Sequence, residues 1–180
     1  MATVIDGSAS VTINNGAVLG ITSGTMQTSP PTIPQYFDFT SIPPWVKRIT
    51  VMFNGVSTSG SSLVQIQIGD GSVNTSGYNS GAVIAASATT WTGNVTTGFV
   101  TGVSANSGAT SLRYGTYIIS LLGNNTWAGQ GNIHESTFYN LGAQCAGAKV
   151  LSGTLDRVRI TTVNGTDTFD AGSINILYEG

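Results

Sequence analysis

Apolar and polar residues alternate along most of the chain, and the three-to-four-residue spacing of an amphipathic helix is almost absent. The clearest case is WVKRITVMF, residues 45–53, in which one face carries Trp45, Ile49, Val51 and Phe53. Successive side chains of a strand point to opposite faces, so this spacing predicts a strand with one buried face. We therefore expect Trp45 to lie in the core.

Several later segments have the same alternation or a short apolar run typical of a strand. They are residues 63–69, 82–88, a strand pair within 91–103, 113–122, 127–138, 155–163 and 174–178. The stretch 69–81 (GDGSVNTSGYNSG) is rich in turn-forming residues and predicts a long loop.

Two hairpins follow from the turn residues. The loop NGVSTSGSS predicts that strands 45–53 and 63–69 pair with each other. Asn164 and Gly165 predict a type I′ turn that joins strand 155–163 to the last strand. Arg157 and Arg159 lie two residues apart, so we expect both on the solvent or interface face of their strand, opposite Val158.

These elements add up to about eight to ten strands, which predicts an all-β fold, an antiparallel β-sandwich of jelly-roll type. Residues 1–35 are polar, and SPPTIP interrupts regular structure near their end. We expect residues 1–35 to be an N-terminal arm or edge segment with a linker, and residues 36–180 to be the sandwich domain.

The amino-acid composition limits the kinds of partner that the chain is expected to bind. Charged residues make up 8% of the 180 residues, against roughly 25% in an average protein. The six Lys and Arg residues are scattered, so we expect no nucleic-acid partner. Apolar runs are far shorter than a membrane helix, and residues 1–25 lack the pattern of a signal peptide. We expect synthesis in the cytoplasm and no membrane insertion.

Residues that could carry catalysis are few. His134 is the one histidine, and a metal site needs three or more ligands. A Gly-x-Ser-x-Gly elbow is absent. The loop acids of GDGS and the pair Asp167 and Asp170 allow either a calcium site or ordinary turn formation. We expect no enzyme activity, no cofactor and no metal. Cys145 is expected to be an inert core residue, with a reactive thiol or intermolecular pairing as the alternatives.

Aromatic residues among turn formers are the candidate ligand-binding residues. An indole or phenol beside amides can stack on a sugar ring while the amides bond its hydroxyls. The candidates are Trp127, Trp91, Tyr78 and Asn124. The alternative is that Trp91 and Trp127 cap the ends of the sandwich core.

Three stretches of the chain resemble a known group of proteins. PPWVKRITVMFNGVSTSGSS (43–62), GTLDRVRITTVNGTDTFDAGSINILYE (153–179) and the opening VTINNGAVLGITSGT (11–25) are similar to phrases in tailed-bacteriophage and prophage virion proteins. The resemblance is to tail-fibre or receptor-binding tips and to head-fibre or decoration modules, and it covers about half the chain. It implies a trimeric β-sandwich that binds surface polysaccharide or a protein receptor, and it includes no catalytic motif.

The leading expectation is therefore a non-catalytic virion protein, a homotrimeric tail-fibre tip that binds host-surface glycan. The alternative is a capsid decoration or head-fibre protein that binds other virion proteins. A polysaccharide depolymerase is the third possibility, disfavoured because such enzymes generally use two positioned carboxylates and this chain has few. The chain could be a separately encoded tip, a decoration protein or a fragment of a longer fibre.

Overall fold

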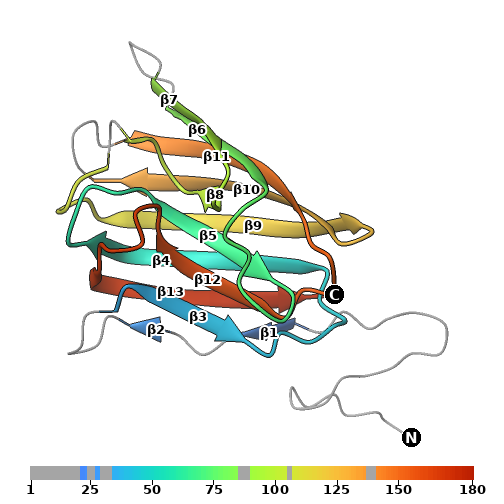
Figure 1. Cartoon of the computed structure of the whole chain (residues 1–180). Coiled ribbons are helices and arrows are strands. Elements are labelled where there is room, and N and C mark those ends of the chain that lie inside the picture. Colours follow the sequence, from blue (N-terminus) through green and yellow to red (C-terminus); the bar gives the residue numbers. More distant parts are fainter. Residues whose placement is uncertain (1–20, 24–26, 29–33, 85–89, 105–106, 137–140) are drawn as a thin grey trace, which may run out of the picture.

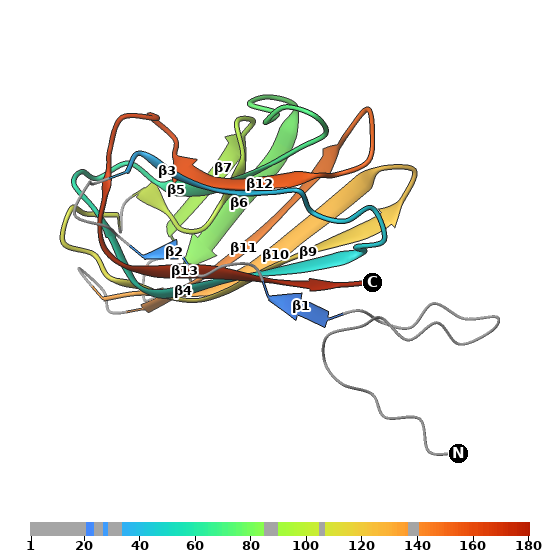
Figure 2. The same cartoon turned by 90° about the horizontal axis from the view of Figure 1, so that it is seen from below.

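Two antiparallel sheets packed face to face form the molecule (Figure 1). The computed structural model describes residues 21–23, 27–28, 34–84, 90–104, 107–136 and 141–180. The larger sheet has nine strands and the smaller sheet has four. Figure 2 shows β3, β5 and β12 of the small sheet along one side of the sandwich, and β4, β9, β10 and β13 of the large sheet along the other. The predicted antiparallel β-sandwich is confirmed.

The large sheet takes strands from the whole length of the chain. In spatial order its main path consists of β1 (Ile21–Ser23), β13 (Phe169–Glu179), β4 (Arg48–Thr58), β9 (Arg113–Gly123), β10 (Thr126–Glu135), β11 (Leu141–Val150), β6 (Tyr78–Ile84) and β7 (Thr90–Val95). The short β2 (Gln27–Thr28) also pairs with β13. The boundary expected near residue 36 stays a prediction, although parts of 1–35 lie at this edge of the large sheet.

The small sheet covers one face of the large one. Its order is β3 (Tyr36–Thr40), β12 (Arg157–Thr162), β5 (Val64–Gly69) and β8 (Phe99–Val100). Most inward residues of both sheets are apolar and form one core, and the buried Arg113 and Glu135 are among the exceptions. Fully buried examples are Val51, Ile119 and Ile133 from the large sheet and Ile66, Val158 and Ile160 from the small sheet. The alternation predicted for β4 and β12 is therefore the alternation between core and surface.

Glycines on the inner side of β10 make room for a large aromatic. A Cβ atom added at Gly129 or at Gly131 would lie 2.6 Å from ring atoms of Tyr117, which is fully buried. The Tyr117 ring therefore lies directly on the β10 backbone. This close approach explains why β10 contains two glycines where a strand usually carries larger residues.

Both predicted hairpins are wrong. β4 pairs with β13 and β9, whereas β5 pairs with β12 and β8, so the connection after Thr58 crosses between sheets. β12 and β13 also lie in different sheets. Asn164 does not have the positive φ that a type I′ turn requires, although Gly165 does (φ 69°). The Asn164 Oδ1 atom instead accepts hydrogen bonds from the backbone N–H groups of Thr166 and Asp167.

Four details of the strand prediction also need correction. Trp45 lies outside the strand, which begins at Arg48, and 40% of its surface is exposed. The loop predicted over 69–81 ends at Gly77, because β6 begins at Tyr78. The strand pair predicted within 91–103 is two strands in different sheets, β7 and β8. The segment 141–150 was not predicted, yet β11 is a central strand of the large sheet. Of the predicted strands 82–88 and 127–138, residues 85–88 and 137–138 lie outside the described part of the chain.

A candidate ligand-binding groove on the large sheet

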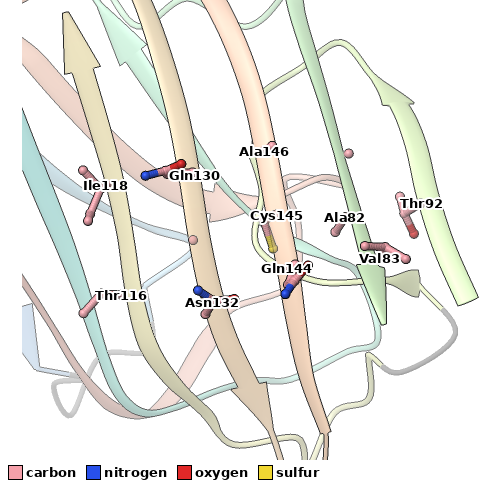
Figure 3. A pocket seen from close by; sticks show the side chains of 12 residues that line it. Ala82, Val83, Thr92, Thr116, Ile118, Gln130, Asn132, Gln144, Cys145 and Ala146 are labelled. Atoms are coloured by element: carbon pink, nitrogen blue, oxygen red, sulfur yellow. The ribbon is translucent and has the colours of Figure 1, made fainter. Parts of the chain in front are cut away.

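The outer face of the large sheet, away from the small sheet, contains an open groove of about 720 Å³. It runs across five neighbouring strands: β9, β10, β11, β6 and β7 (Figure 3). Ligand pockets in proteins commonly have volumes of about 300–1,000 Å³, so this groove is large enough for a small-molecule or oligosaccharide unit. We call it the large-sheet groove.

The antiparallel register places outward side chains of the groove in two rows. Asn132 of β10 lies opposite Thr116 of β9 on one side and Gln144 of β11 on the other. Side chains directly opposite one another in this way have Cβ atoms about 4.5–5.5 Å apart. The second row contains Gln130, which lies opposite Ile118 and Ala146. Three amide side chains are thereby gathered on adjacent positions of two strands, as Figure 3 shows.

Among the described residues, none of these three amides has a hydrogen-bond partner in the protein, and Gln130, Asn132 and Gln144 are all exposed. Each amide presents a carbonyl oxygen that accepts and an NH₂ group that donates. None of the twelve residues that line the groove carries a formal charge. The groove is therefore a neutral surface with donors and acceptors free to bond a ligand.

Small residues create the hollow. Ala146 of β11 and Gly81 of β6 lie opposite each other in the second row, so the floor between Gln130 and β7 is low. A Cβ atom at Gly81 would also approach the Thr92 carbonyl oxygen to 2.8 Å, where the pairing of β6 with β7 is irregular. The sequence thus keeps this part of the sheet free of bulky side chains.

Trp91 lies in the first row at the rim of the groove. It pairs with Val83 of β6, which pairs in turn with Gln144. The side chain is 70% exposed, and a Cβ atom at Gly93 would lie 2.6 Å from the indole ring. The indole therefore lies over Gly93 along the edge strand, with most of its surface open to solvent. This position suits the stacking role expected of Trp91.

Two of the four sequence candidates lie in the core. Trp127 is the second residue of β10 and only 2% exposed, so the alternative in which it belongs to the core is correct. Tyr78 is 3% exposed, and its hydroxyl accepts a 2.7 Å hydrogen bond from the Ile68 N–H. Burial also raises the pKa of Tyr78. Neither ring has an open face on which a sugar could stack, so we withdraw both as ligand-binding candidates.

Asn124 is exposed in the turn between β9 and β10, with a φ of 48°. It is far from Trp91, which is level with Asn132 of β10. The six residue steps from Thr126 to Asn132 span about 20 Å of strand. The structure therefore does not bring Trp91 and Asn124 into one site, and Trp91 is the candidate that borders the groove.

The loop aspartates predicted as calcium or turn residues accept hydrogen bonds from neighbouring residues. The Asp70 carboxylate accepts hydrogen bonds from Ser152 Oγ, Gly153 N and Asn74 Nδ2, and the Ser152 bond contributes most to lowering the pKa of Asp70. Asp167 accepts bonds from Ser62 N and Asn164 Nδ2, which fits the turn-forming alternative for these acids.

The thiol of Cys145 is free and buried, and its burial raises the pKa to about 12. Within the described ranges, His, Cys, Asp and Glu side chains nowhere gather in groups of three or more that could hold a metal ion. His134 of β10 is partly exposed on the outer face, with its ring 6.4 Å from that of Tyr114.

The sequence prediction missed the amides of the groove. Gln130 and Asn132 alternate with Gly129, Gly131 and Ile133, a period of two that identifies one face of a strand. Gln144 alternates in the same way with Ala143 and Cys145, but the small residues around it gave β11 no strong signal.

A scan against protein-family models finds no match to the chain, and a search of curated proteins also finds none. Among the described residues, the structure contains no helix with the length and apolar character needed to cross a membrane.

Proposed function

We propose that the chain is a non-catalytic structural protein of a bacteriophage virion, and that its large-sheet groove binds host-surface glycan. The observation that carries the glycan part is the group Gln130, Asn132 and Gln144, whose amides have no protein partner among the described residues. Sugars present alternating donor and acceptor hydroxyls, and amides can bond both kinds. A neutral lining also avoids the cost of burying a charge beneath a ligand.

The virion assignment rests on the sequence resemblance to tail-fibre tips and decoration modules. Homotrimer formation belongs to the same proposal. A threefold assembly would cover sheet edges, which otherwise invite uncontrolled pairing. The absence of a carboxylate from the lining of the groove supports a binding role in preference to depolymerase activity, since glycosidases generally use two carboxylates.

The alternative is a capsid decoration or head-fibre protein whose main partner is another virion protein. Leu122 of β9 and Val150 of β11 favour it, because they are 68% and 61% exposed at the same end of the large sheet. Both lie next to Thr126 of β10 in the sheet. Val150 pairs with Thr126 on one side, and on the other side Thr126 pairs with Gly123, which directly follows Leu122. Exposed apolar residues grouped in this way are typical of protein contacts.

An array of bacterial surface polysaccharides and neutral and acidic oligosaccharides tests the proposal. We expect the purified chain to bind at least one glycan, and the variant Asn132→Ala/Gln144→Ala to lose that signal. Thr40→Ala is a matched control on the opposite sheet. Binding to empty phage capsids with no binding to any glycan would instead favour the decoration alternative.

A further inference from the structure

The outer face of the small sheet has a pocket of its own, on the opposite side of the sandwich from the groove. Its volume is about 360 Å³. Its walls come from β3, β12 and β5 and from the loops that contain Thr75 and Thr97. We call it the small-sheet pocket.

Two buried glutamines form its floor. Gln65 and Gln67 are 2% and 5% exposed although they point away from the core, because neighbouring loops cover them. Thr97 holds both: its hydroxyl donates to Gln65 Oε1, and its carbonyl oxygen accepts from Gln67 Nε2, each at 2.8 Å. Both amides are therefore fixed in orientation before any ligand arrives, which lowers the entropy cost of binding.

The Gln67 Oε1 atom has no hydrogen-bond partner among the described residues. A buried amide normally satisfies both of its ends. An acceptor without a protein partner, on a residue that is only 5% exposed and that lines a pocket, marks a position where a ligand hydroxyl or an ordered water would bond.

The wall beside the floor consists of Tyr36 and Arg159. The Arg159 guanidinium lies 3.8 Å from the centre of the Tyr36 ring, which is 46% exposed. Arg159 also donates two hydrogen bonds to the Asp38 carboxylate, at 2.7 and 2.6 Å. The ion pair fixes the guanidinium and offsets much of its charge, so we expect the pocket to attract an anion less than an unpaired arginine would. Its remaining features are an aromatic surface, an amide acceptor and threonine hydroxyls.

We infer that the small-sheet pocket is a second saccharide site, specific for a neutral sugar unit that contacts Tyr36 and donates a hydroxyl proton to Gln67 Oε1. One chain would then bind sugar on both faces of the sandwich. The inference does not depend on the large-sheet groove, because the two sites share no residue.

The test is a titration of the ¹⁵N-labelled chain followed by two-dimensional NMR. The probes are glucose, galactose, mannose, N-acetylglucosamine and the anionic sugar glucuronate. We expect at least one neutral sugar to give saturable shifts of the Gln67 side-chain amide and of the backbone amides of Tyr36 and Thr97. Glucuronate is expected to bind more weakly than that neutral sugar.

Three variants locate the binding. Tyr36→Ala changes an exposed side chain and is expected to weaken binding about tenfold, the effect of losing one good contact. Gln67→Leu preserves the approximate volume and is expected to weaken it similarly. Thr40→Ala is the matched control. Thr40 is exposed on β3, the strand that contains Tyr36, but lies outside the pocket, so this substitution should leave the affinity unchanged.

Unchanged affinity in both Tyr36→Ala and Gln67→Leu would overturn the inference, as would shifts confined to the large-sheet groove for every sugar. Stronger binding of glucuronate than of all neutral sugars would overturn its neutral specificity. If Asn132→Ala/Gln144→Ala loses no binding while Tyr36→Ala does, the small-sheet pocket stands and the proposed role of the groove fails.

Discussion

The ion pair between Arg113 and Glu135 offers the sharpest test of how the sandwich is held together. Both side chains are almost fully buried, at 0% and 1% exposure, and Arg113 Nε lies 3.2 Å from Glu135 Oε1. Arg113 also donates to Ser107 Oγ and to the Ser111 carbonyl oxygen. The pair thus joins β9 and β10 to the segment that leads into β9.

Removing one partner leaves the other charge buried. At 3.2 Å and an effective dielectric constant of about 20, the attraction is about 5 kcal/mol. Breaking buried pairs typically costs about 3–5 kcal/mol, because the remaining ion keeps its desolvation penalty. We therefore expect Glu135→Gln to lower the free energy of unfolding by about 3–5 kcal/mol. Replacing both partners with apolar residues of similar volume often restores stability, so Arg113→Met/Glu135→Leu is expected to be more stable than either single variant.

The assay is urea unfolding of the wild type, Glu135→Gln, Arg113→Met, Glu135→Leu and Arg113→Met/Glu135→Leu, with midpoint and slope fitted for each. Burial raises the pKa of Glu135, and Arg113 opposes this shift. Without Arg113 the folded protein retains a carboxyl proton that the unfolded chain releases. Stability of Arg113→Met should therefore fall as the pH rises above about 4.5, the unperturbed pKa of a glutamate. A double variant whose loss equals the sum of its two single variants would refute this reasoning, because it would mean that the charges do not interact.

Three further predictions concern other features of the fold. Gly131→Ala should destabilise the protein by about 1–3 kcal/mol in the same urea assay, because the new methyl group meets the Tyr117 ring, whereas Gly142→Ala, with open space around it, should change stability little. Wild-type protein should lose stability as the pH falls below about 3.8, since hydrogen bonds lower the pKa of Asp70 in the folded state, and Asp70→Asn should show less of this loss in acid titrations. An equal acid response in the two proteins would contradict it. Cys145 should not react with a thiol reagent at neutral pH until denaturant is added, because the thiol is buried with a pKa of about 12; rapid labelling of the folded chain would contradict this.

Strands rich in large β-branched residues were predictable, and those made of small residues were not. The segment 113–122 is rich in tyrosine, isoleucine and leucine and lies within β9, and 155–163 contains β12. β11 has the sequence LGAQCAGAKV, whose alanines and glycines carry little hydrophobic contrast between its two faces. That missed strand contributes Gln144, so the groove could not be assembled from the sequence.

Strand pairing failed for a different reason. A short connection between two strands can close a hairpin or cross to the opposite sheet, and local turn residues do not distinguish the two. The Asn164 side chain accepts hydrogen bonds from the backbone of its own loop. Such bonds stabilise a turn equally well in a hairpin and in a connection between two sheets. Turn formers beside Tyr78 and Trp127 likewise suggested exposed loops, although each aromatic lies near the start of a strand with its ring in the core.

The proposed function requires that the neutral large-sheet groove binds glycan through its amides. The most direct measurement is the calorimetric affinity of the strongest glycan from the array for the wild type, for Asn132→Ala and for His134→Ala. His134 lies two residues further along the same outer face and does not line the groove. We predict a loss of about tenfold or more for Asn132→Ala and an unchanged affinity for His134→Ala. Equal affinities for all three proteins, or no glycan bound at all, would contradict the account.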